Sequence, residues 1–319
     1  MSRDVLRECR KVAQFQDGVI SRVQALASGA SPDVIDRLLG SERWQKIHRG
    51  VYLVSSGPPT RNALLWAATC RAGSGAALSH ETAAELFKLT DRNCRPIHVT
   101  IPANRRISPM KGIVVHHSNR LADAIHPSLM PPRTRLEETV LDLVDHSAVF
   151  DSALDIACAA CQRGLTTVPK IVIAMGLRAK LKWRGELATA LGEIGSGVHS
   201  VLEYRYLHKV ERPHGLPEAS RQARVDGAGR TRYLDNLYRD YALCVELDGL
   251  QAHPAEKRWE DLRRVNSITE NGKTVLRYGW IDVDRLFCET AGQVGTVLRH
   301  LGWRGRLRAC GPSCAVGRI

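Results

Sequence analysis

The pattern of apolar and polar positions in the first ninety residues predicts two helices followed by a hairpin. Apolar residues recur at helical spacing over residues 21–29 and again over residues 31–39. Two β-rich runs follow within residues 43–54, separated by a turn that includes Gly50. Residues 79–89 predict a further helix.

Both of the first two helices begin with a capping signal. Ser21 is followed by Gln24 three positions on, which is the capping-box pattern, and Ser31 precedes Pro32 at the first helical position. Helix, turn, helix and hairpin then follow one another in the order of a winged helix. The sequence therefore predicts a winged helix-turn-helix unit at the front of the chain.

The middle of the chain, from about residue 92 to residue 195, has a different pattern. It predicts two strands and three helices, at residues 98–102, 112–118, 135–144, 152–164 and 186–194. The sequence contains no recognisable catalytic spacing in this region. We therefore expect a connecting or interaction domain.

The elements from residue 198 onward follow a regular order. The pattern predicts a helix, three strands, a helix, a strand and a closing helix, over residues 200–212, 220–225, 230–238, 242–249, 254–271, 273–280 and 282–303. The expected order is thus α-β-β-β-α-β-α.

The whole chain is predicted to be a multidomain protein of the α+β or α/β class. Its 319 residues exceed what one ordinary core holds. We expect a winged-helix domain at residues 1–90 and a mixed strand and helix connecting domain at residues 91–197. A third domain is expected at residues 198–305, and residues 306–319 are expected to form a disordered tail.

The charge of the chain points to a polyanionic partner. The net charge is +13 at pH 7 and the isoelectric point is about 9.6. A cationic surface attracts polyanions, of which nucleic acid is the commonest, although a generally basic proteome with a solvated surface would give the same balance. No apolar run approaches the ~20 residues that cross a bilayer, so no membrane partner is expected.

The cysteines are expected to be reduced. The N-terminus lacks the apolar core of a secretory signal, which predicts a cytoplasmic location where disulfides persist poorly. Cys158 and Cys161 stand at helical spacing, which favours core packing. Cys310 and Cys314 lie in the expected tail. Zinc takes four thiolates of this kind, but no compact finger spacing links the two pairs, so packing is the preferred interpretation.

The hairpin of residues 230–249 carries three carboxylates that are expected to converge. A turn near residues 239–242 places Asp235 opposite Glu246, with Cβ atoms ~5 Å apart, and Glu246 and Asp248 share one face. Like charges this close repel unless a proton or a cation relieves them. Mg²⁺ or Mn²⁺ is therefore the expected cofactor, held by Asp235 and Glu246.

An alternative stays open for these acids: solvation on an exposed face, or pairing with Arg232, Arg239 or Arg263. Two features favour the metal. Glu203 on the preceding helix supplies a further carboxylate, and His253 with basic residues of the next helix suits a phosphate backbone. The basic residues that we expect to contact phosphate are Lys257, Arg263 and Arg264.

Residues 198–303 resemble the endonuclease-like domains related to very-short-patch repair (Vsr) nucleases, which belong to the PD-(D/E)XK superfamily. The motifs that carry the resemblance are LEYRYL, GLP, YLDNLY, VELDGLQAH and EDLRRVNSITENGKTVLRY. The resemblance implies a restriction-endonuclease-like αβββαβ core, with Asp235 and Glu246 as the strand acids, Glu203 as the helix acid and His253 as the Vsr-type histidine. The usual lysine of the superfamily is Asp248 here, which leaves catalysis open while the fold is kept.

Residues 14–89 resemble the N-terminal region of AbiEi-type antitoxins, through GVISRVQALASGASPDVIDRLL, RWQKIHRGVYLV and ALSHETAAELFKL. That resemblance implies a winged helix that binds DNA. Whether the second helix reads DNA bases stays open, because it carries Asp33 and Asp36 as well as Arg37. The alternative is a winged helix that binds another protein. His80 is expected to be structural. The residues expected to bind DNA are Arg22, Arg37, Arg43, Lys46, His48 and Arg49.

The function predicted from the sequence is that of a DNA-binding protein with a metal-dependent endonuclease domain, in which Asp235, Glu246, Asp248, His253 and Glu203 form the catalytic set. The alternative is a non-catalytic transcriptional regulator or antitoxin, with a cognate toxin protein as partner. Oligomeric state stays open, although winged helices that read symmetric sites often form homodimers.

Overall fold

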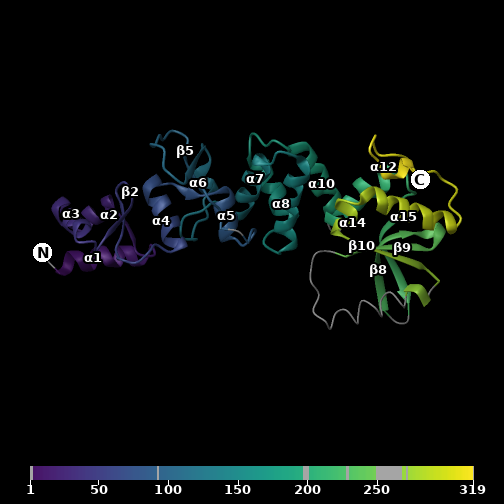
Figure 1. Cartoon of the computed structure of the whole chain (residues 1–319), viewed down its shortest axis with the longest axis horizontal. Helices are drawn as coiled ribbons and strands as arrows, with labels where there is room; N and C mark the ends of the chain where they lie inside the picture. Colours follow the sequence, from purple (N-terminus) through teal and green to yellow (C-terminus); the bar gives the residue numbers. More distant parts are fainter. Residues whose placement is uncertain are drawn as a thin grey trace. The chain divides into compact units, whose positions relative to one another are not determined.

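The computed structural model describes residues 3–91, 93–196, 201–227, 230–248, 268–270 and 272–318. It is an α+β protein with three small sheets in the described residues. The chain divides into two compact units, Met1–Arg184 and Gly185–Ile319, each with its own hydrophobic core (Figure 1). Within the described residues, no helix has both the length and the apolar character that spanning a membrane requires.

The first unit begins with the two predicted helices and the predicted hairpin in the expected order, preceded by a helix and a strand that the sequence pattern did not predict. The elements are α1 (Arg3–Gln14), β1 (Val19–Ser21), α2 (Arg22–Ala27), α3 (Pro32–Gly40), β2 (Gln45–His48) and β3 (Val51–Leu53). The strand order is β1-β3-β2, with both neighbouring pairs antiparallel. Ile20, Ile35 and Trp44 belong to one buried cluster that joins the helices to the sheet.

The predicted helix starts are confirmed in detail. The Ser21 hydroxyl accepts the backbone N–H of Gln24, and the Gln24 side chain accepts the N–H of Ser21, so both halves of the capping box are present. The Ser31 hydroxyl caps the next helix, with Pro32 as its first residue. Gly50 has φ +72° between β2 and β3, a left-handed conformation that glycine adopts without cost.

The rest of the first unit packs helices around a second three-stranded sheet. Its elements are α4 (Arg61–Ala72), β4 (Ala77–Leu78), α5 (His80–Leu86), β5 (Ile97–Pro102), β6 (Ile113–Ser118), α6 (Leu121–Ala124), α7 (Leu136–His146), α8 (Phe150–Gln162) and α9 (Val168–Leu177). β5 pairs antiparallel with β4 and parallel with β6. Because β4 pairs with β5, residues on both sides of the expected boundary at residue 90 share one core.

The second unit contains a four-stranded sheet covered by helices. Its elements are α10 (Arg184–Ser196), α11 (Val201–Arg205), a π-helical turn (Tyr206–Glu211), α12 (Arg212–His214), β7 (Ser220–Gly227), β8 (Arg230–Tyr238), β9 (Leu243–Asp248), β10 (Thr274–Gly279), α14 (Trp280–Asp284) and α15 (Phe287–His300). The strand order is β10-β9-β8-β7, and only β10 and β9 are parallel among these strands. Figure 1 shows α15 lying along the sheet, where Val294 packs into one core with Val245.

The C-terminal segment differs from the disordered tail expected at residues 306–319. Cys314 and Val316 are buried in the core of the second unit. The backbone N–H of Arg308 donates to the carbonyl of His214 at 2.8 Å, and Leu307 packs on that core. Its apolar residues therefore cover α15, which the low hydrophobicity of the segment did not indicate.

Candidate functional site

The register of the β8–β9 hairpin is the one predicted from the sequence. The ladder pairs Tyr238 with Leu243 and Asn236 with Val245, around a short 3-10 turn at Arg239–Tyr241. Continued by one step, this register brings Asp235 opposite Glu246. Val245 is buried in the core, as expected for the face opposite the acids.

The sheet is irregular around Asp235. The β8–β9 ladder ends one pair short of it, and the β7–β8 ladder passes from Asn236 to Leu234 without a partner for Asp235 among the described pairs. Gln222, across from Asp235 on β7, has φ +45°, which is uncommon for a residue other than glycine. Asp235 Oδ2 accepts the backbone N–H of Leu247 at 2.9 Å, so its carboxylate takes the place of a ladder partner.

A single amide joins two of the three predicted metal ligands. Gln222 Nε2 donates to Glu203 Oε1 at 3.0 Å and to Asp235 Oδ1 at 3.2 Å. Glu203 projects from α11 and is 4% exposed, and Glu246 is 6% exposed. The fold thus gathers Glu203 and Asp235 around one nitrogen, although they lie far apart in the sequence. Glu246 Oε1 on β9 accepts a hydrogen bond from the thiol of Cys244 at 3.3 Å.

Asp248 has a different environment. Arg277 on β10 holds it with two hydrogen bonds, Nη2 to Oδ1 at 2.7 Å and Nε to Oδ2 at 3.0 Å. An arginine other than the three considered from the sequence therefore neutralises this carboxylate. His253, Lys257, Arg263 and Arg264 lie outside the described residues.

The donor chemistry at Asp235 suits a hard cation, because carboxylate oxygens are the ligands that Mg²⁺ takes. Gln222 Nε2 donates its two N–H groups to the two carboxylates, at the position where a bound cation would place its positive charge. In the described residues, the groups of three or more donor atoms within 4.8 Å of one another contain histidine and cysteine, and these acids are not among them. Binding an ion here therefore requires the Gln222 side chain to turn away.

Three of the six predicted DNA-binding residues of the first unit line an open pocket of about 660 Å³. Arg22 at the start of α2, together with Lys46 and Arg49 of the hairpin, lines this pocket, and Arg71 of α4 adds a cation that the sequence did not suggest. Arg22 Nη1 donates to the hydroxyl of Tyr52 at 3.4 Å, which orients the guanidinium at the rim. Asp36 also lines the pocket, so four cations and one carboxylate leave it with a net positive charge.

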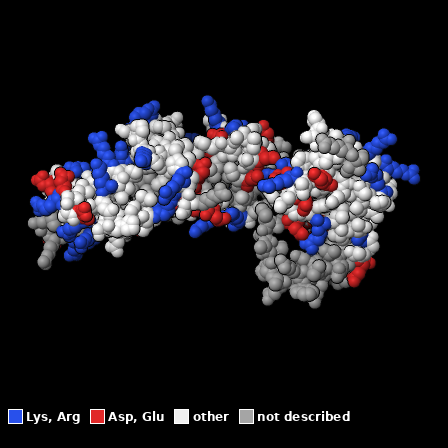
Figure 2. Space-filling view, in the orientation of Figure 1, with Lys and Arg blue, Asp and Glu red and all other residues white. Residues whose placement is uncertain are grey.

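The other three residues that were predicted to bind DNA have different environments. Arg37 and Arg43 are exposed, whereas His48 is half-buried. Burial, and after it the neighbouring Arg71, lowers the pKa of His48, so this side chain is neutral at pH 7 and carries no phosphate-binding charge. Figure 2 shows Lys and Arg side chains along both units with Asp and Glu between them, so net charge alone does not locate an interface.

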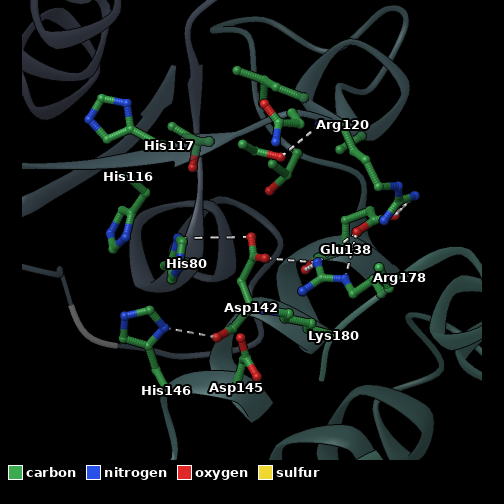
Figure 3. Close-up of a pocket in the computed structure, with 17 residues that line it drawn as sticks. His80, His116, His117, Arg120, Glu138, Asp142, Asp145, His146, Arg178 and Lys180 are labelled. Carbon is green, nitrogen blue, oxygen red and sulfur yellow. Dashed lines mark hydrogen bonds and ion pairs between the residues drawn. The ribbon is translucent and has the colours of Figure 1, made fainter. Parts of the chain in front are cut away.

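A histidine-rich cavity of about 600 Å³ in the first unit was not predicted (Figure 3). His80 begins α5, His116 lies on β6 and His146 ends α7. The rings of His80 and His116 stack with centroids 3.6 Å apart, and His146 meets His80 edge-on at 4.6 Å. His80 Nδ1 lies 2.9 Å from the hydroxyl of Ser79, the local contact that the sequence suggested for it.

Burial determines the protonation of this cluster. Burial, and after it the imidazoles of His116 and His146, lowers the pKa of His80 to about 2. Burial and the imidazoles of His98 and His146 lower the pKa of His116 to about 4. These rings are therefore neutral at pH 7, and their low pKa values make them weak proton acceptors.

The carboxylates that line the cavity are held by arginine. Arg178 Nη2 donates to Asp142 Oδ1 at 2.8 Å and to Glu138 Oε2 at 2.6 Å, as Figure 3 shows. Burial nevertheless raises the pKa of Asp142 to about 6, against the opposing effect of Arg178. Asp142 Oδ2 lies 3.8 Å from His80 Nδ1. The usual order of the two pKa values is thus reversed in this cavity, because the carboxyl of Asp142 holds a proton more readily than the imidazole of His80 does.

The stacked rings limit what this cluster can hold. Nitrogen atoms of His80, His116 and His146 lie within 4.8 Å of one another, so the residue types and distances suit a metal. An imidazole keeps a bound ion in the plane of its ring, and two parallel rings 3.6 Å apart have no common plane. The present arrangement therefore disfavours joint coordination of one ion by His80 and His116.

A scan against protein-family models and a search of curated proteins both find no match for this chain.

Proposed function

We propose that the second unit is a metal-dependent phosphodiesterase that acts on DNA. The observation that carries the proposal is the convergence of Glu203 and Asp235 on the amide of Gln222 at a break in the sheet. Backbone irregularities of this kind cluster at functional sites, where surrounding structure holds them in place. The order of helix, three antiparallel strands and a parallel fourth strand supports the restriction-endonuclease-like core inferred from the resemblance.

In this proposal the residues of the chain divide the work of hydrolysis. Asp235 and Glu203 hold Mg²⁺ or Mn²⁺, which when bound polarises the phosphate and lowers the pKa of a water molecule. Glu246, which is buried on the neighbouring strand, adds its negative charge to the site. Gln222 releases its two carboxylate contacts and donates to the substrate instead. Asp248 is a positioning residue that holds Arg277 on the neighbouring strand.

The first unit would supply the affinity for DNA. The strand order β1-β3-β2 behind α2 and α3 supports a winged helix, and the pocket lined by Arg22, Lys46 and Arg49 suits phosphate. Phosphate contacts of this kind position a protein on a duplex without reading its sequence. Cutting specificity would then come from residues of the second unit.

The proposal is tested by replacing Asp235 with asparagine. Asp235→Asn keeps an oxygen that accepts the N–H of Leu247, so the hairpin should stay folded while one negative ligand is lost. We expect cleavage of plasmid and oligonucleotide DNA with Mg²⁺ or Mn²⁺ to fall at least about a hundredfold, the order found when one charge-stabilising group is removed. Asp240→Asn, in the exposed turn, is the matched control and should cut like the wild type.

Two outcomes of that assay contradict the proposal. One is equal cleavage by the wild type and Asp235→Asn, which would point to a contaminating nuclease. The other is no cleavage by the wild type on single-stranded, duplex, mismatched and supercoiled substrates with either ion.

The second candidate function is DNA binding without catalysis, as in a regulator or antitoxin. The observation that favours it is the pairing of Asp248 with Arg277, because a position next to the acids is already neutralised. On this alternative, promoter binding survives Asp235→Asn, and removing the cations at Arg22, Lys46 and Arg49 abolishes it. Cleavage and fluorescence anisotropy measured on the same wild-type sample separate the two functions, because only the alternative expects DNA binding without cleavage.

A further inference from the structure

Four metal-ligating side chains meet in the second unit, and two of them are the cysteine pair that the sequence analysis assigned to the C-terminal tail. We call this group the C-terminal Cys/His cluster, and its members are His214, Cys288, Cys310 and Cys314. One donor atom from each of the four lies within 4.8 Å of all the others. They come from three separate segments: the end of α12, the start of α15 and the C-terminal segment.

His214 is arranged as a metal ligand would be. Its ring is fully buried, and Nδ1 donates to the carbonyl of Val210 at 2.9 Å. Nε2 is buried and has no hydrogen-bond partner among the residues that the structure describes. A buried polar nitrogen without a partner lowers the stability of the folded state by about 1–3 kcal/mol, and a metal bound at Nε2 would remove this penalty. Metal-binding histidines typically donate their other N–H to a carbonyl in this way, because that bond fixes the tautomer and the ring orientation.

The thiols of the cluster are spaced for coordination and too far apart for a disulfide. Cys288 Sγ and Cys310 Sγ are 3.5 Å apart, whereas a disulfide bond is about 2.05 Å long. In a tetrahedral site with Zn–S bonds of about 2.3 Å, two sulfurs stand roughly 3.8 Å apart. Cys314 is buried at 4% exposure and completes the group from the side of the core.

We propose that the C-terminal Cys/His cluster is a structural zinc site. Three thiolates and one imidazole form the Cys₃His set of closed, tetrahedral zinc sites, and thiolates disfavour the hard ions Mg²⁺ and Ca²⁺. With all four positions filled by protein, the zinc has no open position for water and serves the fold. The site does not depend on the carboxylates of β8 and β9 or on any activity of the second unit.

The contacts around the cluster indicate what the zinc stabilises. The C-terminal segment already touches α12 through Arg308 and the core through Leu307 and Val316. Gly215, next to His214, has φ +67°, and a Cβ there would lie 3.1 Å from the Arg308 side chain. Zinc would fix this segment to both helices at once, which explains how a polar, glycine-containing stretch stays ordered without a long helix or strand.

The proposal is tested by measuring zinc in the full-length protein, purified in reductant, with inductively coupled plasma mass spectrometry. We expect about one zinc ion per chain, as a closed Cys₃His site requires. Less than roughly 0.2 per chain, both as purified and after incubation with equimolar Zn²⁺ and removal of free metal, would overturn the proposal. So would a disulfide between Cys288 and Cys310 found by peptide mapping of that sample.

Replacing one ligand locates the ion. Cys310 is exposed, so Cys310→Ser removes a thiolate without opening a cavity. In the cobalt-substituted protein, the sulfur-to-metal charge-transfer absorption should fall by about a third, because its intensity follows the number of bound thiolates. Cys161→Ser, at a half-buried thiol of α8, should leave the absorption unchanged. A spectrum of Cys310→Ser identical to that of the wild type would overturn the assignment.

One further variant separates this site from the proposed catalytic one. Asp235→Asn should keep its zinc in full, whatever happens to DNA cleavage. Loss of zinc from Asp235→Asn would contradict the independence of the two sites.

Discussion

At the scale of single residues, the histidine cavity gives the clearest dependence on pH. Burial lowers the pKa values of His80 to about 2 and of His116 to about 4, and lowers that of His98 as well. A histidine whose folded pKa is below its ordinary value of 6.5 binds protons more readily when unfolded. The stability that it contributes is complete above pH 6.5 and is lost as pH falls toward the folded pKa.

Asp142 changes the stability of the folded state with pH in the opposite direction, and by less than the histidines together. Burial raises its pKa to about 6, so the folded state takes up a proton between about pH 6 and the ordinary pKa of 3.8, which adds stability there. The stability that the three imidazoles lose on acidification exceeds the stability that the one carboxyl group gains. We therefore expect the first unit to lose on the order of 2 kcal/mol or more between pH 7 and pH 5, since one pKa unit is worth about 1.4 kcal/mol.

The measurement is hydrogen exchange in urea at both pH values, followed on peptides from α5 and α7. His80→Asn removes the buried imidazole and keeps a residue that tolerates φ +51°. This variant should show a smaller loss of protection at pH 5 than the wild type. His300→Asn, at the exposed end of α15 in the other unit, is the control and should behave like the wild type. An unchanged pH dependence in His80→Asn would contradict the prediction.

At the scale of elements, the contact between α15 and the C-terminal segment depends on one glycine. A Cβ on Gly295 would lie 2.7 Å from the side chain of Leu307, closer than real Cβ contacts. Gly295→Ala should therefore displace Leu307 and lower the free energy of unfolding of the second unit by ~1–3 kcal/mol, as overpacking does. Thermal unfolding followed by circular dichroism measures this change.

Gly192 in α10 provides the matched control. Nothing lies within 4 Å of a Cβ at this position, so Gly192→Ala gains helix propensity without a clash. It should raise stability by ~0.5–1 kcal/mol. If both substitutions had the same sign, packing of the segment on α15 would not be the cause.

Local signals in the sequence predicted several elements well and missed others. Ser21 with Gln24 specified a helix start because the capping box forms between residues three apart. α4 went unpredicted because its sequence, RNALLWAATCRA, is apolar on most of its surface and lacks the one-sided periodicity of a surface helix. The predicted helix at 282–303 is divided into α14 and α15, which the periodicity did not reveal.

At the scale of the whole molecule, the net charge of +13 predicts binding that weakens steeply with salt. Each phosphate contact contributes a slope of about −0.9 to the dependence of log K on log salt concentration. Alanine at Arg22, Lys46 and Arg49 should therefore weaken DNA binding and reduce the magnitude of the slope by up to ~3. Fluorescence anisotropy across a salt series measures both quantities.

A control triple variant with alanine at Arg106, Lys111 and Lys170 removes the same charge from exposed positions of the first unit. For this control, the slope of log K against log salt concentration should be closer to the wild-type slope than that of the pocket variant. Equal effects of the two triple variants would mean that the protein binds through its overall charge and that the pocket beside the hairpin has no special part.

The sequence by itself determined the features that depend on residues near one another along the chain. It specified the helix caps at Ser21 and Ser31, the order of the four strands in the second unit, and the register that sets Asp235 opposite Glu246. The predicted helix at residues 254–271 lies mostly outside the described residues. The specified features follow from capping bonds, side-chain alternation and a short turn, each of which acts over a few residues. No long-range information was needed for them.

Only the tertiary structure decided which distant side chains meet. Gln222 between Glu203 and Asp235, Arg277 on Asp248, the stacked His80 and the Cys/His cluster each join segments that are separated by many residues. Their pairing depends on strand order and helix packing, which periodicity does not specify. Charge and burial at these places are properties of the folded chain, because they arise when the core brings the segments together.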